Sequence, residues 1–440
     1  MIKTICHQLW NQRRMNGWIF LEILIVSIFL WLVLDPVCVL TATRNQPVGY
    51  ESEGRYVVRL KALEKNHVEY KEAYEADSLR LFYYDQIFRL LREMPEVDSY
   101  TVSLQQSFPS SGNWSGGTLY PDTLSLAAKE FKHGQWYAFV NLPGSNPMKT
   151  YGLKDAFTGE DMTMPADCRN CMIISENMAV SLWGSKTGAI GKTVYESKKK
   201  KYQVAGVFQN YKHFTNTEYY PLYIYFKEKI EADPYMGYRY PFVFKLKEGV
   251  DEAAFQARFH REVAPLLKMG NIRFSSLRSF QSYIDEHSEA SGINNVFRLQ
   301  YALTGFALFC IFLGMLGTFW IRSNARRQEI GVMRSMGASR HAISSQFLSE
   351  AALIVTGAFL CALPLLWLYA EWVGLSLPAT ASSYSGELRD TTFWPNRFGL
   401  HFAIVSLVSY LVIILTALTG TYIPVSLASR ILPADALRDE

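Results

Sequence analysis

The chain has 440 residues, of which 49% are apolar, 14% are aromatic and 19% are charged. This charged fraction lies below the soluble norm of about 25%, and the apolar fraction is too high for a disordered or collagen-like chain. Because 44 basic residues nearly cancel 40 acidic ones, the net charge of +4 argues against a nucleic-acid-binding protein. Long uncharged runs alternate with ordinary polar sequence, which indicates a membrane protein with a large soluble part.

The N-terminal segment carries apolar residues at helical spacing, which predicts an amphipathic helix at residues 1–17 in the membrane interface. A frayed tail is the alternative. A first membrane span is predicted at residues 18–40, because its apolar core is longer than that of a cleaved signal peptide, the alternative reading. Glu22 and Asp35 lie near the two ends of this span. Both side chains are therefore expected to reach the interface rather than act within the bilayer.

Three more uncharged runs approach or exceed the roughly 20 residues needed to cross a bilayer. They predict spans at residues 298–321, 347–372 and 398–424. Pro424 is expected to end the last span, because proline cannot continue a helix interior.

Basic residues predict the orientation of the chain. They gather in the N-terminal segment, in the loop 322–346 and in the tail 425–440, so these three segments are expected in the cytoplasm. Residues 41–297 and the short loop 373–397 are then expected outside the cytoplasmic membrane. In a Gram-negative bacterial cell that side is the periplasm, and the membrane is the inner membrane. The predicted fold class is four transmembrane α-helices plus a large mixed α/β periplasmic domain inserted between spans 1 and 2.

The predicted periplasmic domain contains two helix-then-strand patterns, at residues 79–104 and 255–277. They flank an irregular middle region, which suggests an insertion. Residues 278–321 are expected to form a helical stalk that runs into span two, with a break at Gly292.

Two motifs of this domain resemble binding sites. Residues 188–193 end like a phosphate-binding loop, yet position 186 is a lysine where the pattern requires glycine, and the run that follows is strand-like. No ATP site is therefore predicted in this chain. Lys198–Lys201 lie between two strand-like runs, which predicts a solvated hairpin tip, with a contact to anionic lipids as the alternative.

Cys168 and Cys171 form the only close pair of cysteines in the sequence. A zinc site needs four ligands at fixed spacing, and neither a second pair nor suitably spaced histidines are present, so no metal is predicted. Outside the cytoplasm the two cysteines can form a disulfide, and a free pair is the alternative. Because no nucleophile–base–acid signature is present, no catalytic residue and no cofactor are predicted in this chain.

The most informative segment lies between spans two and three. Ile330, Met333 and Met336 step along one face of a predicted short helix, which Gly337 is suited to end and after which Ser339 can cap span three. A short amphipathic helix in a cytoplasmic loop is suited to dock in a partner's groove. A helix resting on the membrane interface is the alternative.

This loop also carries a resemblance to a known family. Glu329-Ile-Gly-Val-Met-Arg-Ser-Met-Gly-Ala-Ser339 resembles the loop signature of the MacB/FtsX-type permeases of ABC transporters. The tail at residues 424–438 is similar to that family's ending, and residues 191–194 and 202–208 resemble strands of its periplasmic core domain. The order also agrees: one span, a domain of about 250 residues, then three spans.

The resemblance implies a permease subunit that pairs with a second permease subunit, identical or different, and binds two cytoplasmic ABC ATPase subunits. ATP and Mg²⁺ would be held by the ATPase, which is expected as a separate chain because this one begins at its first span. The implied role is to transmit ATP-driven movement to the periplasmic domain for export, efflux or lipoprotein release. The implied ATPase-coupling residues are Glu329, Ile330, Gly331, Met333, Arg334, Met336, Gly337, Ala338 and Ser339.

Two other functions stay open at this point. An FtsX-like signalling subunit would regulate an envelope enzyme, and a dedicated outer partner would favour it, whereas a periplasmic adaptor would favour efflux. A membrane-anchored sensor would work without any ATPase. In every case membrane lipids are expected partners and nucleic acid is not.

Overall fold

The computed structural model describes residues 13–105, 107–112, 115–163, 170–379, 389–390 and 392–428. The chain forms two compact units, which are treated separately. The membrane unit comprises Met1–Ala42, Asn294–Pro378 and Thr391–Glu440, and the α/β unit comprises Thr43–Ile293 and Ala379–Asp390. Most of the amphipathic helix predicted at residues 1–17 lies outside the described residues.

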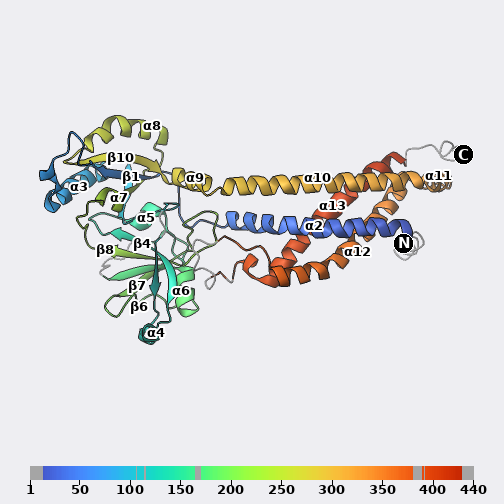
Figure 1. Ribbon diagram of the computed structural model, residues 1–440, viewed down its shortest axis with the longest axis horizontal. Coiled ribbons are helices and arrows are strands. Elements are labelled where there is room, and N and C mark those ends of the chain that lie inside the picture. The colour runs from blue at the N-terminus through green and yellow to red at the C-terminus, as the bar shows by residue number, and fades with distance from the viewer. Residues whose placement is uncertain are drawn as a thin grey trace. The chain divides into compact units, whose positions relative to one another are not determined.

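Four long apolar helices make up most of the membrane unit (Figure 1). They are α2 (Arg13–Asn45), α10 (Ile293–Ala325), α12 (Arg340–Val373) and α13 (Phe398–Ala428). Each contains an apolar stretch long enough to cross a bilayer: Gly17–Asn45, Ile293–Thr318, Arg340–Val373 and Phe398–Leu427. The short helices α11 (Arg327–Ser335) and η5 (Trp394–Asn396) belong to the connections.

The ends of two spanning helices bear on the predictions. α12 begins at Arg340, directly after the predicted cap Ser339, so the helix starts before the predicted span 347–372 does. α13 continues through Pro424 to Ala428, so this proline does not end the last helix. Within a membrane, neighbouring groups can satisfy the backbone carbonyl that an interior proline leaves free.

The core of the membrane unit lies where α2, α12 and α13 meet. Ile23 and Leu30 of α2 pack with Ala351 and Ala358 of α12 and with Ile413 of α13, all of them almost fully buried. The two alanines allow the helix backbones to approach each other, as small residues commonly do between membrane helices.

The α/β unit is built on one ten-stranded mixed sheet (Figure 1). Neighbouring strands are antiparallel except for the pairs β4–β8 and β5–β7, which are parallel. The strands in spatial order are β10 (Ile272–Ser279), β1 (Arg55–Ala62), β9 (Phe242–Leu246), β2 (Val97–Ser103), β4 (Lys132–Val140), β8 (Leu222–Lys227), β5 (Cys171–Ser175), β7 (Lys201–Phe208) and β6 (Thr193–Tyr195), and β3 (Gly116–Leu119) also pairs with β4.

Helices cover both faces of this sheet. Successive side chains of a strand point to opposite faces, and apolar side chains on both faces pack against helices. Tyr56 and Val58 of β1 pack with α3 (Asp77–Arg92) and α8 (Glu252–Arg258). Val57 points to the opposite face, where α5 (Pro147–Tyr151) and α9 (Phe280–Ala290) lie. The remaining helices of the unit are α4 (Thr123–Ala128), α6 (Glu176–Trp183) and α7 (Met236–Arg239).

The predicted helix-then-strand units are α3 followed by β2 and α8 followed by β10. The four spanning helices and the mixed sheet inserted between the first two confirm the predicted fold class. The break predicted in the helix leading to span two is present, because α9 ends at Ala290 and Gly292 takes a φ of +67°.

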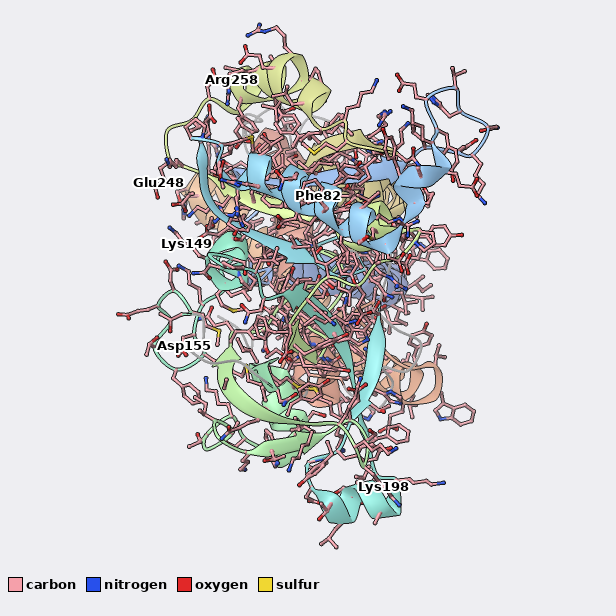
Figure 2. All side chains as sticks on the ribbon, turned by 90° about the vertical axis from the view of Figure 1, so that its left-hand side faces the viewer. Phe82, Lys149, Asp155, Lys198, Glu248 and Arg258 are labelled. Carbon is pink, nitrogen blue, oxygen red and sulfur yellow. The ribbon has the colours of Figure 1, made fainter. Side chains whose placement is uncertain are left out.

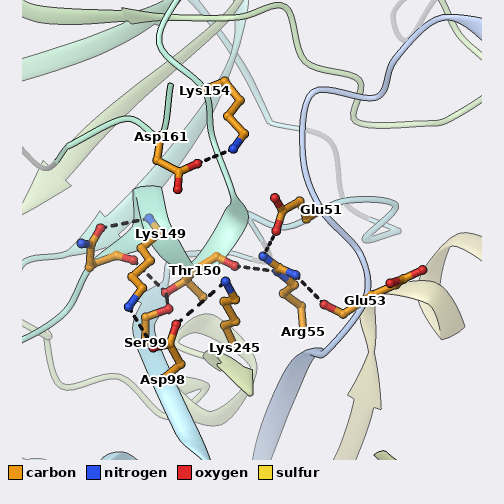
Figure 3. Close-up of polar contacts among 11 residues, drawn as sticks. Glu51, Glu53, Arg55, Asp98, Ser99, Lys149, Thr150, Lys154, Asp161 and Lys245 are labelled. Atoms are coloured by element: carbon orange, nitrogen blue, oxygen red, sulfur yellow. Dashed lines mark hydrogen bonds and ion pairs between the residues drawn. The ribbon is translucent and has the colours of Figure 1, made fainter. Parts of the chain in front are cut away.

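A polar cluster ties α5 to the first two strands (Figure 3). Arg55, which is 4% exposed, pairs with the Glu51 carboxylate and donates to the carbonyl of Thr150 at 3.3 Å. Lys149 donates to Asp98 Oδ1 at 2.8 Å. The buried guanidinium is thus compensated by hydrogen-bonded acceptors, as a buried charge requires.

Of the lysine-rich segment Lys198–Lys201, the first three residues lie in the exposed turn between β6 and β7, and Lys201 is the first residue of β7. Figure 2 shows Lys198 beside α4, with Phe82 and Arg258 toward the other end of the α/β unit. Lys200 Nζ lies 3.3 Å from Glu196 Oε2. The predicted hairpin tip is therefore present, and no contact in the structure bears on the lipid alternative.

Candidate functional site

The loop between α10 and α12 folds into the short helix α11. Gly337 ends its last turn at a φ of +92°, where the amide of Gly337 donates to the carbonyl of Arg334 at 3.0 Å. Only glycine adopts this backbone conformation without strain. Ser339 then accepts from the amide of Ala342 at 3.1 Å and caps α12. The structure therefore places the predicted stop and the predicted cap at these two residues.

One face of α11 packs against the membrane unit itself. Ile330 is 3% exposed and lies in a cluster with Ile343, Phe347 and Val425. Met333 and Ala338 pack at the margin of this cluster, and Gly331 is also buried. These residues hold the helix in place, so the structure does not present Ile330 to a partner.

The exposed side of α11 carries a different set of apolar residues. Val332 is 46% exposed and Met336 is 79% exposed. Met336 does not share a face with Ile330. The two residues are two steps of three apart, and each step falls about 60° short of a full helical turn, so their side chains point about 120° apart. Glu329 and Arg334 are partly exposed, and Gly337 and Ser339 are exposed. Sequence reasoning missed Val332, although its position two residues from Ile330 on a helix signals the opposite face.

A buried ion cluster joins α11 to α12. The guanidinium of Arg326 donates to both oxygens of Glu329, at 2.6 and 2.7 Å, and to Glu350 Oε2 at 2.7 Å. Arg326 is 5% exposed and Glu350 is 1% exposed, and the guanidinium carbon lies 4.5 Å from the centroid of the Phe347 ring. A planar guanidinium fits this bidentate and stacked arrangement, which a lysine could not reproduce.

The two acids keep Arg326 charged. Burial by itself lowers the pKa of Arg326, but the hydrogen bonds and negative charges of Glu329 and Glu350 outweigh it, and the net pKa is raised. Sequence reasoning missed this cluster because Arg326 and Glu350 are 24 residues apart, and no spacing rule links them. The arrangement supplies a stiff joint between a short helix and a spanning helix, and no group positioned for proton or group transfer.

A small polar hollow lies on α12 and α13 close to this joint. Its volume is about 380 Å³, and its lining includes His341, Ser344, Ser349 and Tyr422. No ligand chemistry follows from these groups alone.

The other predicted residues lie elsewhere. Cys171 is the first residue of β5, is buried and is disulfide-bonded, whereas Cys168 lies outside the described residues, so the predicted bridge between them stays a prediction. Glu22 is partly buried and Oε2 accepts from Thr318 Oγ1 of α10 at 3.2 Å. In the part of the chain that the structure describes, no group of three or more His, Cys, Asp or Glu residues could hold a metal ion.

Asp35 is buried inside the membrane unit: it is 5% exposed, and its Oδ1 lies 2.6 Å from His401 Nε2 of α13. The expectation that Asp35 reaches the membrane interface stays a prediction, because the structure does not mark where the interface lies. The contact with His401, 366 residues away in the sequence, was not predicted.

The C-terminal part of the chain matches a known family. Residues 301–433 match the family described as FtsX-like permease C-terminal. This match covers α11 and its flanking helices and confirms the resemblance to the MacB/FtsX-type permeases that the loop motif predicted. Over these residues the chain is similar to FtsX-like permeases.

Solved structures with limited similarity include the following two. The periplasmic region of MacB from Actinobacillus actinomycetemcomitans is 11% identical, with a TM-score of 0.30, and the match covers 56% of this chain and 97% of that one. A domain of a protein described as a permease from Porphyromonas gingivalis is 16% identical, with a TM-score of 0.29, and the match covers 52% and 92% of the two chains. No curated protein sequence matches the chain.

Proposed function

We propose that the chain is the permease subunit of an ABC transporter that transmits ATP-driven movement from a separate cytoplasmic ATPase to its α/β unit. The observation that carries this proposal is the form of α11. One side of the helix is fixed to α12 by Arg326 and Ile330, while Val332 and Met336 project from the other side. A helix that is anchored on one face and exposes apolar side chains on the other is suited to fit a partner's groove and to pass its movement on.

The rigid joint makes the transmission mechanical. A displacement of α11 acts on Glu350 through the Arg326 guanidinium, and Glu350 lies in α12, a helix of 34 residues. Bending a helix requires a cause such as proline, and α12 contains one at Pro364. In this proposal the part of α12 from Arg340 to residue 363, which includes Glu350, moves as a unit. In this proposal the inner membrane holds the spans, two permease subunits act together, and ATP and Mg²⁺ are bound by the ATPase chains.

The work done by the α/β unit is proposed to be export, efflux or release of lipoproteins. The FtsX-like match supports a permease in general, and the choice among cargoes would depend on the surface of the α/β unit. Regulation of an envelope enzyme by the same movement is the signalling form of this proposal.

The test is co-purification of the tagged full-length chain from its native membranes in mild detergent. The expected companion is a stoichiometric ATPase that carries a phosphate-binding loop, and it should be lost in Met336→Asp. Met333→Asp and Glu329→Arg should also abolish ATPase coupling, the latter by breaking the pair with Arg326. Leu124→Asp is the matched control, because Leu124 in the α/β unit is as exposed as Met336, at 79%.

Two results would overturn the proposal. If the wild-type protein never co-purifies with an ATPase, the membrane-anchored sensor becomes the favoured function. An ATPase that stays bound and coupled in Met336→Asp, Met333→Asp and Glu329→Arg would show that α11 is not the coupling helix.

A further inference from the structure

A buried ion pair lies at the end of the membrane unit from which the chain enters the α/β unit. Asp35 of α2 and His401 of α13 approach each other at 2.6 Å between Oδ1 and Nε2. Asp35 is 5% exposed and His401 is fully buried. Ionisable residues inside a membrane protein are rare and generally mark a functional site, so this pair requires an explanation beyond packing.

The hydrogen bonds around the pair fix the number of protons that it holds. His401 Nδ1 lies 2.9 Å from the carbonyl oxygen of Pro395, and a carbonyl only accepts, so Nδ1 carries a hydrogen. Nε2 and Asp35 Oδ1 are too close for two lone pairs to face each other, so a proton also lies between them. The other carboxylate oxygen accepts from the amide of Ser376 at 2.9 Å. Both contacts of the imidazole can be hydrogen bonds at the same time only when the pair holds one proton more than a neutral histidine beside an ionised aspartate.

Aromatic side chains surround the pair. The ring of Trp394 meets the His401 imidazole edge-on at 5.2 Å between centroids. Trp31, fully buried one turn before Asp35, donates to Ser406 at 3.1 Å and packs on Phe402. Such a setting strengthens the hydrogen bond between the two side chains, because little water is present to compete for it.

Titratable and charged side chains also lie on the described elements packed against the pair. On α2, Cys38 lies close enough to interact electrostatically with Asp35. On the entry to α13, the carbonyl of Arg397 accepts from the His401 amide at 2.8 Å while its side chain is exposed. At the end of α12, Glu371 accepts from Trp367 at 2.8 Å and is exposed.

We propose that Asp35 and His401 form a proton-binding site whose single extra proton closes this end of the membrane unit. With the proton bound, one imidazole links α2, through Asp35, to Pro395 of η5, and Asp35 in turn holds Ser376 after α12. When the proton leaves, the neutral imidazole has one N–H for two acceptors. It then gives up either Asp35 or Pro395, and this end of the unit loosens.

The ligand of this site is a proton, and its binding requires neither ATP nor a partner chain. The inference therefore does not depend on the transport function proposed above. It adds a second input to the same helices, because proton loss would change how tightly α2, α12 and α13 are held together where the chain leaves the membrane unit.

The test uses the full-length chain in lipid nanodiscs, with ¹⁵N-labelled histidine and hydrogen–deuterium exchange, from about pH 5 to about pH 10, a range that spans the ordinary histidine titration. The His401 signal is assigned by its loss in His401→Gln. At the low end of the range we expect one proton on Nδ1 and one shared with Asp35, seen as an imidazolium or as a protonated Asp35 carboxyl in the infrared. As the pH rises and that proton is lost, amide exchange in peptides containing Ser376 and residues 396–401 should increase about tenfold or more, after correction for intrinsic exchange.

Asp35→Asn is the decisive variant because it should keep the shape and remove the pH dependence. An asparagine amide can donate to the neutral Nε2, and its oxygen can still accept from the Ser376 amide. Exchange in these peptides should therefore stay slow across the whole range. Trp31→Phe removes a neighbouring hydrogen bond without touching the pair, and it should retain the wild-type pH dependence.

Either of two outcomes would overturn the proposal. One is a wild-type protein in which His401 carries a single proton and Asp35 is ionised throughout the range. The other is wild-type exchange at these peptides that is as independent of pH as in Asp35→Asn.

Discussion

Replacing Glu350 by glutamine should loosen α11 without unfolding the membrane unit. The wild-type carboxylate is 1% exposed and accepts a hydrogen bond of 2.7 Å from Arg326. Removing one partner of a buried ion pair costs about 3–5 kcal/mol when the other charge is left alone. Here Arg326 keeps its two hydrogen bonds to Glu329, and glutamine retains one acceptor oxygen. The expected loss is therefore nearer the value of one charged hydrogen bond, about 2 kcal/mol.

Amide exchange of α11 in nanodiscs measures this loss directly. The amide of Ile330 donates to the carbonyl of Arg326 at 3.0 Å, so it reports opening of the first turn. A loss of about 2 kcal/mol corresponds to exchange about 30 times faster. Ser349→Ala is the control, because Ser349 bonds within α12, to the carbonyl of Ser345, and stands beside Glu350 in the sequence. Exchange that rises less than about threefold in Glu350→Gln, or no more than in the control, would refute the reasoning.

Four further outcomes follow from the structure. The double variant Arg326→Leu/Glu350→Leu should destabilise α11 by less than the two single variants together, as measured by amide exchange. The reason is that the double variant leaves neither buried charge without its partner. Burial lowers the pKa of Lys212 to about 8, so chemical unfolding should show stability rising by up to about 3 kcal/mol between pH 8 and 10.5, a rise that Lys212→Met should lack. Burial also lowers the pKa of His213 to about 3, so the neutral ring stabilises the fold above pH 6.5. The free energy of unfolding should fall by up to about 5 kcal/mol as the pH falls from 6.5 toward 3. A His213→Gln variant that loses as much stability in acid would contradict this. Gly49→Ala should lower the thermal midpoint far more than Gly188→Ala, because the added carbon would lie 2.1 Å from a backbone oxygen at position 49 and meets nothing within 4 Å at position 188, although both glycines have a positive φ.

The features that the sequence predicts are those encoded locally. An uncharged run of sufficient length forms a span regardless of which helices it packs against. Gly337 ends α11 and Ser339 caps α12, and both effects depend only on residues nearby in the sequence. The two buried ion pairs are different. Arg326 and Glu350 are 24 residues apart, and Asp35 and His401 are 366 residues apart. Nothing in the composition of either segment identifies its partner, so the sequence treats each acid as a group at a membrane border.

The short helix α11 shows a second limit. Its spacing predicts an amphipathic helix, and the structure contains one, but spacing cannot say which face is taken by the chain itself. Ile330 is used internally, and the apolar surface that remains belongs to Val332 and Met336. Which face is free depends on residues such as Val425, which belong to a helix near the other end of the chain.

The order of strands in the sheet also constrains how the protein is made. β1 is the first strand to be synthesised, yet its neighbours in the sheet are β9 and β10, at residues 242–246 and 272–279. Until those residues have been translated, β1 lacks both neighbours and its apolar side chains have no sheet to join. Contacts between such distant residues fold slowly, and unpaired strands are prone to aggregate. The chain therefore has to carry more than two hundred residues of incomplete sheet past its first spanning helix before the α/β unit can close, which makes chaperone protection during biogenesis a direct consequence of this topology.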